Sequence, residues 1–243
     1  MTQTEIWGKF SDKIELIEEA LNADYAIGSY YMPIILNLNI AERHPRTDIV
    51  FSAYHRNLFA LYASVELTNK GLFGPSRSIL RHVFESLVIG KFCSLTTNND
   101  VYLRWQQGQT IYFTNNVLNK IKKPSSTVFK EYWGIMSEFV HASVYAQQMS
   151  FDWEHLHGNI QFNWDLTLAL IECHYHLLIS HLITPSISYY ADYASFHSGQ
   201  NERTKLSQRK KLIRSLFSDA KKSSIPPFRR LIRDFKRTWV LES

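Results

Sequence analysis

Helical periodicity runs through almost the whole chain and constrains its fold more than any other feature. The clearest stretch is residues 75–95, where the apolar side chains follow the 3.6-residue period of an α-helix without a miss. Those side chains are Ile79, Leu80, Val83, Phe84, Leu87 and Val88. Only 9 Gly and 7 Pro occur in 243 residues, which disfavours a β-sandwich with many turns and favours long helices. We therefore predict an all-α fold.

The same spacing predicts further helices along the chain. We expect them in residues 5–22, 48–70, 75–95, 99–120, 127–148, 164–192, 203–222 and 227–240. Between them we expect a short apolar segment at 25–41, a polar connection at 149–163 and a break at Pro185. Short connections favour an antiparallel helical bundle, here in residues 1–200, with a basic helical C-terminal appendage in residues 201–243.

Three features favour a cytoplasmic location. Cys93 and Cys173 lie in apolar helical runs, which predicts buried thiols and no disulfide. The N-terminal residues lack the basic and apolar regions of a signal peptide. The most apolar stretch, residues 166–183, carries Glu172 and three histidines, so we expect a buried helix and no membrane span.

Charge is distributed unevenly along the chain. Between Arg203 and Arg237 lie 13 of the 27 basic residues and 2 of the 22 acidic ones, so this segment carries +11 and the remainder −6. Nucleic acid is a partner that such a segment permits. An acidic membrane surface, an acidic protein or no partner at all are the alternatives. The candidate nucleic-acid-binding residues are Arg209, Lys210, Lys211, Arg214, Arg229, Arg230 and Arg233.

Two polar pairs interrupt otherwise apolar helices and are the best candidates for a site. Arg81 and Glu85 form one pair, and Ser137 and His141 form the other. Both have i, i+4 spacing and fall at the edge of an apolar arc, so we expect them to meet at a seam between helices. If they meet, three roles are open: a polar clamp, a ligand site in which arginine holds a phosphate or carboxylate, or catalysis.

In the catalytic interpretation, His141 would move a proton while Arg81 holds an anion and Glu85 orients either group. Arg77 and His82 are the runner-up pair for the same roles. No P-loop, dinucleotide fingerprint, nucleophile elbow or paired Cys-x-x-Cys occurs, so we predict no cofactor.

These motifs resemble a bacterial family of helical proteins classed as a domain of unknown function. The resemblance rests on the run PSRSILRHVFESLVIGKF with its Arg-x3-Glu and on EYWGIMSEFVHAS with its Ser-x3-His, and it spans roughly residues 50–185. It implies a helical bundle more than an activity. We take from it the expectation of a non-enzymatic binding module in bacterial stress or phage defence.

More remotely, the chain is similar to HEPN domains, many of which cleave RNA without metal through Arg-x4–6-His on one helix. Arg77 and His82 have that spacing, whereas His141 does not follow an arginine in this way. The resemblance implies the alternative of a metal-independent ribonuclease, acting at the seam of a homodimer.

A metal site is the remaining alternative in the histidine-rich regions. His174 and His176 point apart on a helix, and His174 and His181 share a face without a third ligand, so we expect core or seam histidines there. The cluster DWEHLH at 152–157 is expected to be a solvated loop. We predict no metal.

Overall fold

The computed structural model describes residues 8, 10–37, 46–96, 100–140, 156–197, 202–223 and 226–241. Its α-helices are α2 (Ser11–Asn37), α3 (Thr47–Asn69), α4 (Phe73–Leu95), α5 (Asp100–Gln106), α6 (Ser125–Val140), α8 (Leu156–Leu177), α9 (Pro185–His197), α10 (Glu202–Ser223) and α11 (Pro226–Lys236). Shorter helical turns are η2 (Phe113–Val117), η3 (Leu118–Lys120) and η4 (Leu178–Leu182). The described residues form no strand, so the all-α prediction is confirmed.

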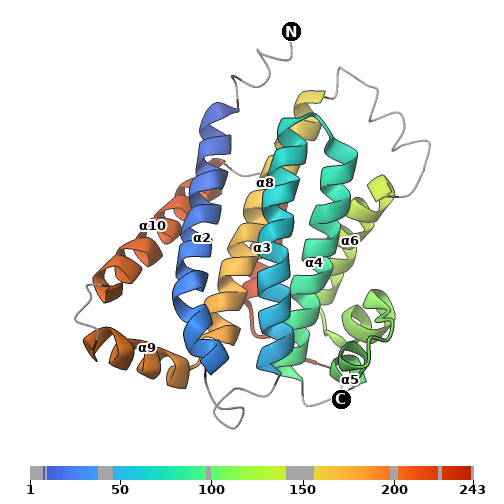
Figure 1. The fold of residues 1–243 in the computed structure, drawn as a ribbon. Coiled ribbons are helices and arrows are strands. Elements are labelled where there is room, and N and C mark those ends of the chain that lie inside the picture. The colour runs from blue at the N-terminus through green and yellow to red at the C-terminus, as the bar shows by residue number, and fades with distance from the viewer. Residues whose placement is uncertain are drawn as a thin grey trace.

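The long helices α2, α3, α4 and α8 stand side by side and make up the centre of the molecule (Figure 1). The turn between α3 and α4 uses Gly71, whose φ of 75° is readily adopted only without a Cβ. α8 contacts α2, α3 and α4, whereas α2 contacts α3 much less than it contacts α8. α3 is therefore held mainly by α4, and α2 mainly by α10 and α8.

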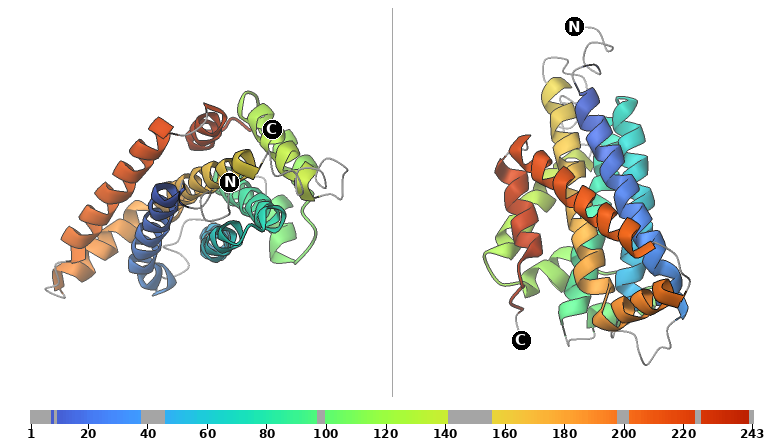
Figure 2. Two further views of the ribbon diagram at one scale, coloured as in Figure 1. Left: turned by 90° about the horizontal axis from the view of Figure 1, so that it is seen from above. Right: turned by 90° about the vertical axis from the view of Figure 1, so that its left-hand side faces the viewer.

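The remaining helices cover the flanks of this centre (Figure 2). α6 packs on α4, and α11 lies against α8 and α6. α10 crosses α2, and α9 lies against the end of α2 (Figures 1 and 2).

The core is one continuous apolar cluster, and the basic C-terminal segment belongs to it. Its side chains Ile213, Phe217, Phe228, Leu231 and Phe235 are buried together with the bundle residues. Apolar burial of this kind is the main driving force for packing. The described residues of 202–223 and 226–241 thus share the bundle core, while most of the basic side chains whose exposure is described face outward.

Several predicted helix boundaries are correct and four are wrong, including the end of the helix predicted at 227–240, which stops at Lys236. α3, α4, α10 and the break at Pro185 are close to prediction. Residues 5–22 and 25–41 were predicted as two segments, but α2 runs unbroken through Ser11–Asn37 with Pro33 inside it. The helix predicted at 99–120 ends at Gln106, and Gly108 follows with a φ of 65°. The connection predicted at 149–163 is already helical from Leu156.

Among the described helices, none taken singly has the length and apolar character to cross a bilayer. Only Gly158–Leu182 and Pro185–Tyr193 meet that requirement as a pair, across a bend of 85°.

Candidate functional site

Arg81 and Glu85 form the salt bridge that their spacing predicts, and the partner across the seam is Trp133. The Arg81 Nε atom lies 3.0 Å from the Glu85 Oε1 atom, and both side chains are about four-fifths buried. Trp133 of α6 donates its indole N–H to the same carboxylate at 2.6 Å. The guanidinium also lies over the Trp133 ring, 5.1 Å from its centroid. Each charged group is satisfied, which is the geometry of a clamp between α4 and α6.

Ser137 lies one turn after Trp133 but does not join this cluster. Its hydroxyl donates to the Trp133 carbonyl of its own helix at 2.6 Å. His141 lies outside the described residues. Of the four predicted residues, the structure therefore brings Arg81 and Glu85 together, while Ser137 is buried and hydrogen-bonded within its own helix.

Arg77 and His82 point in different directions. Arg77 is buried against α8, where its Nε donates to the Asn163 Oδ1 at 2.6 Å and its Nη2 to the Asn159 Oδ1 at 2.8 Å. His82 faces solvent on the other side of α4, and partial burial together with the charge of Arg56 lowers its pKa. The spacing thus places the two side chains on the same helix without bringing them together.

Most of the predicted nucleic-acid-binding residues have partners within the protein. Lys210 donates to the Tyr31 hydroxyl at 2.8 Å, and Arg209 lies in a shallow groove with Glu15, Glu18 and Glu19. Farther along, Arg230 pairs with Glu131 at 3.2 Å and Arg233 with Asp234 at 3.5 Å. Lys211, Arg214 and Arg229 are exposed. The acidic α2 therefore opposes the charge of α10.

The histidines of α8 and η4 are seam residues. His174 is fully buried: its Nε2 donates to the Tyr54 carbonyl at 2.7 Å, and its Nδ1 lies 2.5 Å from the Asp24 carboxylate. Neither nitrogen is left to bind a metal. His181 contacts Ser94 at 2.9 Å. No group of three metal-ligating side chains occurs among the described residues, and the cluster in 152–157 lies outside them except for the backbone of its last two residues.

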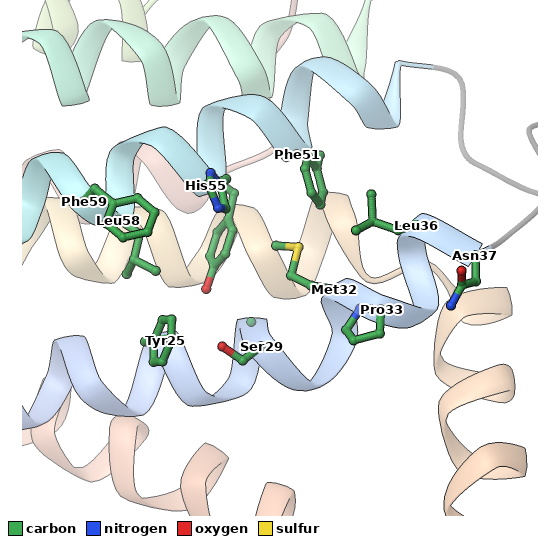
Figure 3. A pocket seen from close by; sticks show the side chains of 12 residues that line it. Tyr25, Ser29, Met32, Pro33, Leu36, Asn37, Phe51, His55, Leu58 and Phe59 are labelled. Carbon is green, nitrogen blue, oxygen red and sulfur yellow. The ribbon is translucent and has the colours of Figure 1, made fainter.

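A groove between α2 and α3 was not predicted from the sequence. It has a volume of about 580 Å³ and is lined mainly by apolar and aromatic side chains. Figure 3 shows Tyr25, Met32 and Leu36 of α2 facing the Phe51–His55–Phe59 row of α3. We call it the α2–α3 groove; it is lined by Tyr25, Gly28, Ser29, Met32, Pro33, Leu36, Asn37, Phe51, Tyr54, His55, Leu58 and Phe59.

The floor of the α2–α3 groove is fixed by Tyr54. Its hydroxyl donates to the Asp24 carbonyl at 3.0 Å, and its ring stacks on His174 with centroids 4.2 Å apart. Gly28 makes room for this hydroxyl, since a Cβ there would lie 2.0 Å from it. Burial raises the pKa of Tyr54 well above its ordinary value. The floor is therefore rigid and uncharged.

Polar groups enter the groove at a few points only. Pro33 has no N–H, so it donates no helical hydrogen bond to the Ser29 carbonyl one turn earlier. Ser29 lies on the α2 side of the groove and His55 on the α3 side (Figure 3). One turn beyond Tyr25 and Phe59, Tyr62 donates to Asn22 at 2.8 Å and ties the two helices together.

Comparison of the chain with protein-family models, with curated proteins and with solved structures gives no match.

Proposed function

We propose that this chain is a helical binding module whose site is the α2–α3 groove. Its ligand is an elongated apolar molecule that carries one hydrogen-bond donor. The proposal rests on an open apolar groove whose wall presents a carbonyl without a helical donor. Ligand sites in proteins commonly combine an apolar lining with a few placed polar groups, in cavities of about 300–1,000 Å³.

The dimensions of the groove favour a narrow ligand. From Tyr25 to Leu36 it extends over 11 residues of α2, or roughly 16 Å at 1.5 Å per residue. The volume of 580 Å³ then gives a mean cross-section of roughly 36 Å². An α-helix about 10 Å across needs roughly 80 Å². An alkyl chain or linked rings would fit, whereas a whole partner helix would not enter.

We expect the hydrogen-bond donor of the ligand to lie near the middle of the groove, beside Ser29. The Ser29 carbonyl can only accept, so it selects a hydroxyl or amide N–H over a carboxylate or an ether. Phe59 and Leu36 are each 58% exposed at the rim and would lose that exposure to a bound ligand. Burial of such side chains supplies affinity at about 25 cal/mol per Å².

A direct test uses an apolar fluorescent dye, anilinonaphthalene sulfonate, and 1-decanol as a competitor. The dye should bind the wild-type protein with increased fluorescence, and 1-decanol should displace it. At ten times its Kd, 1-decanol should also raise Tm by about 4 °C, because binding only to the native state adds about 1.4 kcal/mol.

Two variants distinguish binding in the groove from binding to other apolar surface. Met32→Trp places an indole in the groove and should abolish both responses, whereas Leu103→Trp on the exposed side of α5 should leave them unchanged. Equal binding of 1-decanol by the two variants, or no dye binding by the wild type, would refute the proposal.

The ribonuclease alternative needs a histidine and an arginine in one open cleft. Among the described residues, Arg77 is enclosed by the amides of α8 while His82 faces solvent. Arg81 is held by Glu85 and Trp133. These positions give the alternative no support, so the binding module is the proposal we carry forward.

A further inference from the structure

Three segments distant in sequence form one surface beside the C-terminus. The Lys122 backbone N–H donates to the Val240 carbonyl at 2.8 Å, and Ile121 makes a β-bridge with Leu241. Phe129 of α6 packs against Trp239 with ring centroids 5.2 Å apart. These contacts hold the segment at 121–123, the start of α6 and the end of the chain side by side, and Figure 2 shows α11 next to α6.

This surface is basic. We call it the α6–α11 basic face, defined by the exposed side chains Lys122, Lys123, Lys130, Arg229, Arg230 and Arg233. Two carboxylates lie within it: Glu131 pairs with Arg230, and Asp234 is buried, with Arg233 and Arg237 at 3.5 and 3.2 Å. Beyond these pairs, the exposed Lys122, Lys123 and Lys130 contribute three further positive charges.

The other half of the basic C-terminal segment is arranged differently. α10 lies across α2, where Arg209 shares a shallow groove with Glu15, Glu18 and Glu19. The basic residues of the C-terminal segment therefore lie on two different surfaces of the protein, one on α10 and one on α11. Both halves meet acidic residues of the body, since Arg230 also pairs with Glu131 and Lys236 with Glu172, but only the α11 half is joined by three lysines from residues 122–130.

The chemistry of the face favours a phosphate backbone as its partner. Binding at a membrane surface uses apolar or aromatic side chains inserted beside the basic ones. In the described parts of 120–140 and 226–241, Val240 is the one large apolar side chain that is strongly exposed, at 61%. Exposed aromatic rings on which unpaired bases would stack are also missing from these segments. A surface with basic side chains and without exposed aromatic rings is suited to the phosphate backbone of a duplex, whose bases are already stacked.

We infer that the α6–α11 basic face binds the phosphate backbone of duplex nucleic acid independently of its sequence. The inference is separate from the proposed ligand groove, which lies on α2 and α3. With four or five phosphates contacted, the slope of log K against log salt should be about −4. Affinity should then fall roughly 250-fold between 50 and 200 mM salt.

The test is fluorescence anisotropy with 20-base-pair RNA and DNA duplexes of unrelated sequences. Two double variants with the same change in net charge are compared: Lys123→Glu with Lys130→Glu on the face, and Lys205→Glu with Lys211→Glu on α10. The face variant should lose at least tenfold in affinity and about two units of salt slope. The α10 variant should lose less than threefold. Circular dichroism checks that both variants fold.

Several outcomes would overturn the inference. They are no duplex binding by the wild type at 50 mM salt, equal losses in the two variants, or binding to phosphatidylserine vesicles without binding to either duplex. A preference between the RNA and DNA duplexes would identify which backbone the face favours and would leave the inference standing.

Discussion

Replacing Lys91 by methionine should change the way in which stability depends on pH. The Lys91 side chain is buried, with 1% of the residue exposed, and its Nζ donates to the carbonyls of Phe235 and Arg237 at the end of α11. The Trp239 ring centroid is 4.5 Å away. Burial lowers the pKa of Lys91 from its ordinary 10.5 to about 8. A neutral amine keeps two N–H donors, so both carbonyl bonds survive loss of the proton.

The direction in which the free energy of unfolding changes with pH follows from proton linkage. The native state binds this proton more weakly than the unfolded chain does, so the free energy of unfolding rises with pH between about 8 and 10.5. From pH 7 to 9.5 the native amine loses its proton while the unfolded one keeps it, which gives a gain of about 2 kcal/mol. Burial raises the pKa of Cys93, Cys173 and Tyr54, and these groups act in the opposite direction at alkaline pH. They are common to both proteins and cancel in the difference.

The assay is urea denaturation of the wild type and Lys91→Met at pH 7, 8, 9 and 9.5. The free energy of unfolding of the wild type, relative to the variant, should rise by about 2 kcal/mol over this range. Lys211→Met, on the exposed side of α10, is the control and should give a constant difference. A wild-type advantage that stays constant or falls with pH for Lys91→Met would show that the native amine stays charged, and would refute the reasoning.

Three further predictions concern other parts of the molecule. Gly28→Ala should lower the free energy of unfolding, measured by urea denaturation, by about 2 kcal/mol, because the new Cβ would displace the Tyr54 hydroxyl on the groove floor. Gly134→Ala is the control: open space surrounds this glycine, so the substitution should stabilise the protein by up to about 1 kcal/mol. Equal effects of the two substitutions would contradict the packing described. Trp133→Phe keeps the ring under the arginine but removes the N–H bound to Glu85, so we expect a loss of about 1 kcal/mol, and an unchanged stability would argue against the clamp. RNA incubated with the protein in EDTA should remain intact; cleavage that disappears in folded His141→Ala would replace the binding module by a ribonuclease.

Much of the fold could be predicted because burial imposes a helical period on the sequence. α4 is the clearest case, since its apolar residues occupy one face without interruption. The boundary predicted between residues 22 and 25 does not exist, and α2 also continues past Pro33. The period continues through Ile27, Tyr31 and Ile35, all of them buried, and this packing outweighs the hydrogen bond lost at the proline. In the region after Gln106 the period is present, but Gly108 turns the chain and Phe113 is buried from a short π-helical turn.

The candidate site shows where sequence spacing stops being informative. An i, i+4 spacing specifies which side chains are neighbours on one helix, and the salt bridge between Arg81 and Glu85 is the result. It does not specify which residue of another helix will face them, and Trp133 takes the position expected for Ser137. The α2–α3 groove depends on α2 and α3 being held apart, and the residues of either helix do not reveal this separation. A proline inside an apolar helical run was its one visible signal.

The groove and the basic C-terminal segment are connected through α2. α2 makes more extensive contacts with α10 and α8 than with α3, and Lys210 of α10 donates to the Tyr31 hydroxyl on it. Apolar surface between two adjacent helices would ordinarily be removed by bringing them together. Here the packing of α10 on the far side of α2 opposes that movement, and Tyr54 on the floor occupies the space that closer packing would need. The packing of α10 on α2 is therefore the contact that we expect to maintain the separation of α2 and α3 on which the α2–α3 groove depends.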